Sequence, residues 1–156
     1  MSATLVNENM IGKEVVLEGP FGTPPSLPCP WPLLLLAGGV GIAPIHAMIE
    51  TIFLEKPIGQ PVSLIWGARA KDDLYLHDYF QSLASAHSFF SYIPVLEEKT
   101  EGYPTGLITD QLGQIKDIAD CSTYIAGPDK MVAALMPVLL QKGVQKELIF
   151  SDGFGV

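Results

Sequence analysis

Apolar residues in this chain follow two patterns, continuous runs and helical spacing. The run Leu33–Leu36 lies between a proline and a pair of glycines, which is typical of a strand buried on both faces of a parallel sheet. Similar short runs predict four more strands, over residues 62–66, 89–96, 123–126 and 147–151. Apolar residues at i, i+3 and i+4 predict helices between them, the first carried by Ile45, Met48, Ile49, Ile52 and Phe53.

This alternation of strands and helices predicts an α/β fold, a three-layer Rossmann-like five-stranded parallel sheet with helices on both faces. Helices are expected over residues 76–83, over 107–112 as a short helix, and from Met131 onward. Pro137 is expected to kink the last helix and Gly143 to cap it.

A glycine-rich turn joins the first strand to the first helix. Gly38, Gly39 and Gly41 allow a sharp turn and a close approach of the backbone to a ligand, and Pro44 suits the first helical position. Such a helix start directs free N–H groups and a positive dipole end at the space above it, which favours phosphate or pyrophosphate. Tight turns also need glycine for steric reasons alone, so the motif is a weak signal by itself.

Composition narrows the classes of partner. The net charge is −8 without a basic cluster, so we expect no nucleic-acid partner and no membrane partner. The two cysteines, Cys29 and Cys121, are too far apart for a plant-type iron–sulfur motif, and no other metal constellation stands out. Residues 1–10 have neither a basic region nor an apolar core, so we expect no signal peptide and a cytoplasmic protein.

Two further segments distinguish this chain from the ordinary dinucleotide fingerprint. The second strand ends in Gly67-Ala68-Arg69 rather than in an acidic residue, and the fourth opens onto Gly127-Pro128 with Met131 shortly after. Together with the glycine turn, these segments resemble the ferredoxin-NADP reductase-like flavoenzymes. Residues 65–69, 124–127 and 149–154 are most similar to bacterial NAD(P)H:flavin oxidoreductases.

The resemblance implies a domain organisation. Residues 1–22, with Gly19-Pro20-Phe21-Gly22, look like the last strand or remnant of a flavin-binding β-barrel, residues 23–32 form a Pro-rich linker, and residues 33–156 form the NAD(P)-binding domain. The rest of the barrel and its flavin-binding signature have no counterpart in the sequence. FAD or FMN is therefore expected to bind mainly to a domain absent from this chain, which would be part of a longer protein.

The resemblance also implies roles for particular residues. Arg69 flanks the adenosine half of the cofactor, Ala126 lies beside the reacting carbon, and Phe154 lies near the flavin ring. A surface arginine paired with Asp72 or Asp73, and a terminal phenylalanine packed on the core, are the structural alternatives. The full set of expected cofactor-binding residues is Gly38, Gly39, Val40, Gly41, Pro44, Gly67, Arg69, Glu97, Gly127, Pro128 and Met131.

Cofactor preference depends on the end of the third strand. Relatives that prefer NADP carry serine and basic residues there, whereas this chain has Glu97 and Glu98. Two carboxylates would repel a 2′-phosphate, which favours NADH, although Lys99 or Arg69 could restore NADPH binding. Solvated glutamates without any role in specificity remain an alternative.

Three functions stay open at this point. The first is the NAD(P)H-binding domain of a flavin-dependent reductase that passes hydride to a flavin, a task of positioning and water exclusion that needs no protein acid or base. The second is the reductase component of a multicomponent oxygenase, with an electron-acceptor protein as partner. The third is a module that binds NADH without turnover.

Overall fold

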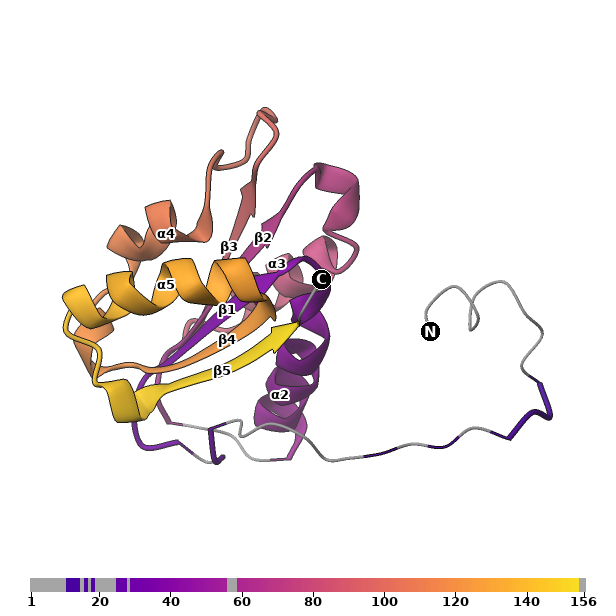
Figure 1. The fold of residues 1–156 in the computed structure, drawn as a ribbon, viewed down its shortest axis with the longest axis horizontal. Coiled ribbons are helices and arrows are strands. Elements are labelled where there is room, and N and C mark those ends of the chain that lie inside the picture. Colours follow the sequence, from indigo (N-terminus) through magenta and orange to yellow (C-terminus); the bar gives the residue numbers. More distant parts are fainter. Residues whose placement is uncertain are drawn as a thin grey trace.

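Five parallel strands form one sheet in the order β3-β2-β1-β4-β5 (Figure 1). The computed structural model describes residues 11–14, 16, 18, 25–27, 29–55 and 59–154. The strands are β1 (Leu33–Gly38), β2 (Val62–Ala68), β3 (Phe90–Leu96), β4 (Ser122–Pro128) and β5 (Ile149–Phe154). The helices are α2 (Ile42–Leu54), α3 (His77–Ala86), α4 (Ile108–Gln111) and α5 (Asp129–Gln141). The predicted fold class is confirmed.

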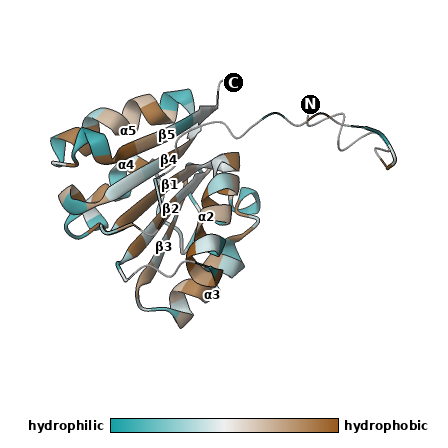
Figure 2. Cartoon of the chain, turned by 90° about the horizontal axis from the view of Figure 1, so that it is seen from below, coloured by the Kyte–Doolittle hydropathy of each residue, from teal (hydrophilic) through white to brown (hydrophobic). Residues whose placement is uncertain are grey.

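Helices cover both faces of the sheet, α2 and α3 on one side and α4 and α5 on the other (Figures 1 and 2). Successive side chains of a strand point to opposite faces. In β1, Leu33 and Leu35 accordingly join the core under α2 and α3, whereas Leu34 and Leu36 join the core under α4 and α5. The leucine run therefore contributes side chains to the hydrophobic cores on both faces of the sheet, which explains why β1 shows no alternation of apolar and polar residues.

The sheet order creates a switch point between β1 and β4. The chain runs from β1 outward to β3, then returns across the sheet to β4, so the connections on the two sides of this point lie on opposite faces. In open α/β sheets, ligands bind outside the carboxyl ends of the strands at such a point. The two glycine-containing turns, after β1 and at the end of β4, lie here.

The end of α5 confirms the expected glycine cap. Gly143 has a φ of +91°, its N–H donates to the Leu140 carbonyl at 3.0 Å, and the Val144 N–H donates to the Leu139 carbonyl at 3.1 Å. This pair of bonds is the Schellman arrangement. The helix continues through Pro137, and the kink expected there stays a prediction.

Several element boundaries differ from the expectation by a few residues, and two of these differences have a local cause. Pro44 is the third residue of α2 rather than the first, because the turn Gly39–Gly41 forms a 3-10 helix that leads directly into α2. Proline is still tolerated there, since the first N–H groups of a helix have no helical partner. The last strand begins at Ile149 rather than at residue 147, because Lys146–Leu148 forms another 3-10 turn.

The expected domain boundaries stay predictions. Most of the proposed barrel remnant, including Gly19-Pro20-Phe21-Gly22, lies outside the described residues. Of the Pro-rich stretch, residues 25–27 and 29–32 are described and contain neither helix nor strand.

Candidate nucleotide site

The ends of β1 and β4 meet through glycines rather than through side chains. A Cβ atom on Gly41 would lie closer than 3.0 Å to the carbonyl of Ala126, and one on Gly127 would lie 3.1 Å from the Gly38 Cα. Real Cβ atoms essentially never approach other atoms closer than 3.0 Å. Gly41 therefore serves the packing of two backbones, whereas the sequence argument assigned its freedom to a ligand.

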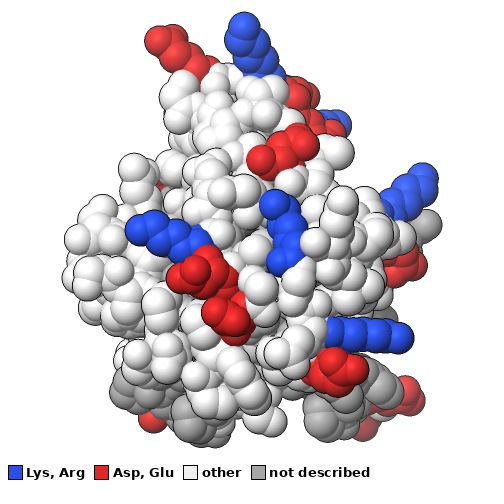
Figure 3. Space-filling view, turned by 90° about the vertical axis from the view of Figure 1, so that its left-hand side faces the viewer, with Lys and Arg blue, Asp and Glu red and all other residues white. Residues whose placement is uncertain are grey.

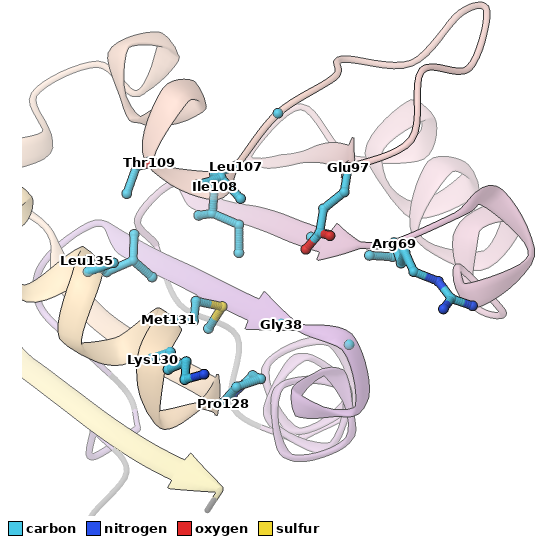
Figure 4. A pocket seen from close by; sticks show the side chains of 15 residues that line it. Gly38, Arg69, Glu97, Leu107, Ile108, Thr109, Pro128, Lys130, Met131 and Leu135 are labelled. Carbon is cyan, nitrogen blue, oxygen red and sulfur yellow. The ribbon is translucent and has the colours of Figure 1, made fainter. Parts of the chain in front are cut away.

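A cavity of about 470 Å³ opens beside these turns, on the side of the sheet that carries α4 and α5 (Figure 4). Its floor includes Gly38 and Gly67, and two apolar side chains lie directly over them: Cβ atoms there would meet Met131 and Ile108 respectively. Leu107 adds a side chain that is 56% exposed. The cavity is thus mostly apolar, with glycine backbone at the strand ends.

Charged groups stand at the edges of this cavity. Arg69 and Glu97 lie at the end formed by β2 and β3, and Lys130 lies on the first turn of α5 (Figure 4). The Arg69 Nε atom is 3.9 Å from a carboxylate oxygen of Glu98, and both side chains are mostly exposed. Such an exposed pair is weak, so the guanidinium can exchange this partner for a ligand phosphate.

The ion pair of Arg69 with Asp72 or Asp73, which was the structural alternative, is not the one observed. The Asp73 carboxylate accepts a hydrogen bond from the Ala70 N–H at 3.1 Å, and Arg69 pairs with Glu98 instead. On the face presented in Figure 3, basic and acidic side chains are interspersed rather than gathered into a field of one sign.

The loop between β3 and α4, residues 97–107, forms one wall of the cavity and is tied to α3. The Tyr103 hydroxyl lies 3.2 Å from His77 Nε2, and the Tyr92 hydroxyl lies 3.3 Å from His77 Nδ1. Burial, reinforced by the neighbouring Tyr103, raises the pKa of Tyr92 well above its usual range, so its hydroxyl stays protonated. His77 is therefore a structural link between α3, β3 and this loop.

Seven of the expected cofactor-binding residues line the cavity: Gly38, Gly39, Gly67, Arg69, Glu97, Pro128 and Met131. The other expected positions do not line it. Val40 is 73% exposed at the turn, whereas Ala126 is fully buried in the core under α2 and α3, where its methyl group has a packing role. The remaining expected residues outside the lining are Gly41, Pro44 and Gly127. The backbone of Phe154 pairs with Pro128, but its side chain lies outside the described part of the chain.

Sequence reasoning missed half of the cavity wall. The residues it missed are Ala68, Gly106, Leu107, Ile108, Thr109, Lys130, Ala134 and Leu135. Lys130 could have been found, because it immediately precedes Met131 in the second glycine-proline motif. Residues 106–109 could not, because they reach the site only when Thr105 bridges to Leu96 at the end of β3.

The structure also bears on metals and membranes. Within the described ranges, no group of three or more histidine, cysteine, aspartate or glutamate side chains is arranged to hold a metal ion. No helix in the described part of the chain is long and apolar enough to cross a bilayer.

Comparison with known proteins identifies the family of this chain. The model of the oxidoreductase NAD-binding domain family matches residues 35–136. The NAD(P)H-flavin reductase of Aliivibrio fischeri is 35% identical over 127 residues, which cover 78% of this chain and 52% of that protein. The reductase component of propane 2-monooxygenase from Mycolicibacterium goodii is 30% identical over 162 residues, covering 98% of this chain and 46% of that protein.

A solved structure agrees with these relatives. The cytochrome P450 reductase GcoB of Amycolatopsis superposes with a TM-score of 0.79 at 25% identity, over 99% of this chain and 50% of that one. The chain belongs to the oxidoreductase NAD-binding domain family, of the ferredoxin-NADP reductase-like kind, as the sequence motifs predicted. It spans about half the length of the curated relatives it matches.

Proposed function

We propose that this chain is the NAD(P)H-binding half of a flavin-dependent reductase that passes hydride from NAD(P)H to a flavin. The observation that carries the proposal is the cavity at the β1/β4 switch point, lined by the glycine turn and by the start of α5. The family match supports the nucleotide. Since the chain spans about half of its relatives, the flavin site is expected on a part of the protein outside this chain.

The residues present fit a dinucleotide. A Cβ on Gly39 would meet nothing within 4 Å, so open space adjoins the backbone of the turn. The cavity volume of about 470 Å³ falls within the range of small-molecule sites. Arg69 and Lys130 supply cationic donors at its edges.

Each part of the cavity then has a task. The bound nicotinamide nucleotide supplies the hydride, and the protein binds, orients and dries it. The turn after β1, which lines the cavity at Gly38 and Gly39, holds the pyrophosphate, Arg69 flanks the adenosine, and Pro128 supports the nicotinamide end. The apolar side chains over the strand ends exclude water, which suits a transfer that needs two rings in contact and no protein acid or base.

Glu97 favours NADH over NADPH. It lies at the cavity edge beside Arg69, and Glu98 adds a second carboxylate next to that arginine. A 2′-phosphate placed near Glu97 would be repelled by its carboxylate, at a cost of roughly 1 kcal/mol at close range.

A second candidate function is the reductase component of a multicomponent oxygenase, supported by the propane 2-monooxygenase relative. It shares the nucleotide site and differs in the output, because electrons would pass on to a protein acceptor. A third, a module that binds NADH without turnover, shares only the binding step.

Oxidation of NADH by the purified chain, with and without FMN or FAD, separates these functions. Loss of the reduced nicotinamide absorbance that depends on added flavin supports the flavin reductase. NADH binding without such turnover, followed by turnover when a flavin-binding barrel from a relative is added, supports a nucleotide-binding half. Failure to bind NADH at all contradicts the proposal.

A further inference from the structure

A buried tryptophan contacts the glycine turn from beneath. Trp66 lies on β2, is fully buried, and belongs to the core under α2 and α3. Its indole Nε1–H donates a hydrogen bond to the Gly39 carbonyl oxygen at 3.0 Å, across 27 residues of sequence. The ring is held by edge contacts with Tyr75 and Phe80, whose centroids lie 5.4 and 6.0 Å away.

This hydrogen bond fixes the orientation of one peptide group. Gly39 has a φ of +51°, a backbone conformation that glycine adopts readily, and this rotation brings its carbonyl into reach of Trp66. In a trans peptide the carbonyl and the following N–H point in opposite directions. The Val40 N–H therefore points away from Trp66.

The positions of Trp66 and of the cavity on opposite faces of the sheet show which way the Val40 N–H points. Trp66 lies on the α2/α3 side, whereas Ile108, Met131 and Leu135, which line the cavity, belong to the α4/α5 side. A peptide whose carbonyl is held toward the first side turns its N–H toward the second. The Gly39 carbonyl also accepts from the Ile42 N–H, so two donors hold it in place.

We propose that Trp66 is a positioning residue for the pyrophosphate of the bound nucleotide. It touches no ligand itself. By holding the Gly39 carbonyl, it presets the Val40 N–H as a donor to the anion before the nucleotide arrives, which removes an ordering cost from binding. This inference rests on the proposed nucleotide site and assigns a role to a residue outside the cavity.

The first test compares Trp66→Phe with Phe90→Leu. Trp66→Phe keeps an aromatic ring and removes the donor. Phe90→Leu removes core volume under α2 and α3, at a residue whose ring contact is with Phe53 rather than with Trp66. Dissociation constants for ADP-ribose and for adenosine are measured by calorimetry with the full chain. We expect Trp66→Phe to weaken ADP-ribose about 3- to 10-fold, the worth of one hydrogen bond, and to leave adenosine within twofold.

The control variant separates positioning from general loosening. Phe90→Leu should lower the melting temperature but keep the dissociation constant for ADP-ribose within twofold. Equal weakening by both variants, or no weakening by Trp66→Phe, overturns the role of Trp66. If the wild-type chain binds neither NADH nor ADP-ribose, the proposed function itself fails, which is a distinct outcome.

A second readout needs no nucleotide. In ¹H–¹⁵N spectra of the free chain, Trp66→Phe should shift and broaden the Val40 amide resonance, whereas Phe90→Leu should leave it in place. An unchanged Val40 resonance in Trp66→Phe shows that the turn keeps its orientation without the indole, and so contradicts the proposal.

Discussion

Replacing Gly41 by alanine should disrupt the junction between β1 and β4. A Cβ there would lie closer than 3.0 Å to three backbone atoms, the carbonyl carbon and oxygen of Ala126 and the nitrogen of Gly127, where ordinary contact needs 3.4–4 Å. These atoms belong to a central strand paired with β1, so they cannot move aside as the end of a flexible side chain could. The two turns that frame the cavity would be forced apart.

The magnitude follows from known overpacking effects. Inserting a methyl group into a tightly packed core costs about 1–3 kcal/mol, and a clash against backbone belongs at the upper end, near 3 kcal/mol. For a protein of this size, about 3 kcal/mol corresponds to a fall in melting temperature on the order of 6–12 °C. Binding of ADP-ribose should weaken as well, because both turns contribute to the site.

Thermal unfolding followed by circular dichroism, together with urea titration, measures the effect. Gly113→Ala is the matched control, because a Cβ at Gly113 would meet nothing within 4 Å. We expect this control to stay within about 0.5 kcal/mol of the wild type. If Gly41→Ala were as stable as Gly113→Ala, the close packing of the two turns would be refuted.

Three further predictions concern charge, the cavity wall and a buried thiol. Glu97→Gln should improve the binding of NADPH relative to NADH about fivefold, because it removes one charge that repels the 2′-phosphate. The control Glu101→Gln should leave the ratio of the two dissociation constants unchanged. An unaltered ratio in Glu97→Gln speaks against the charge argument. Tyr103→Phe removes the hydroxyl that forms a hydrogen bond with His77. It should lower the free energy of unfolding by about 1 kcal/mol and speed amide hydrogen exchange across residues 97–107. Unaltered exchange would contradict a role of this hydrogen bond in holding the loop. Burial, with nearby acidic residues, raises the pKa of Cys121 to about 11. The thiol of the unfolded chain therefore loses its proton at a lower pH than the thiol of the folded chain, so the free energy of unfolding should fall as pH rises from about 9 toward 11. This fall should be less steep in Cys121→Ala. Identical pH slopes of the two chains in urea titrations would contradict the prediction.

Structural features that are set by residues close together in the sequence could be predicted from it. The leucine run of β1 predicted burial on both faces, and the glycine at position 143 predicted the helix cap, since both follow from local geometry and periodicity. The 3-10 turns were missed because each is a single short turn without periodicity, and they displaced the start of β5 and the position of Pro44 within α2.

The candidate site was only partly readable, for a physical reason. Residues at strand ends, such as Gly67 and Pro128, are brought together by the parallel register itself, so motif spacing was enough to predict them. Ile108 reaches the cavity through a long connection whose path depends on tertiary contacts. The packing role of Gly41 was not readable, because only the folded chain shows that its missing side chain faces Ala126 rather than open space.

Titration of the ¹⁵N-labelled chain with NADH, followed through its amide resonances, locates the bound nucleotide on the fold. We expect saturable shifts at residues 38–41, 67–69 and 127–131, with ADP-ribose reproducing the shifts at the glycine turn. Shifts confined to other parts of the chain, or none at millimolar NADH, would contradict a nucleotide site at the junction of β1 and β4.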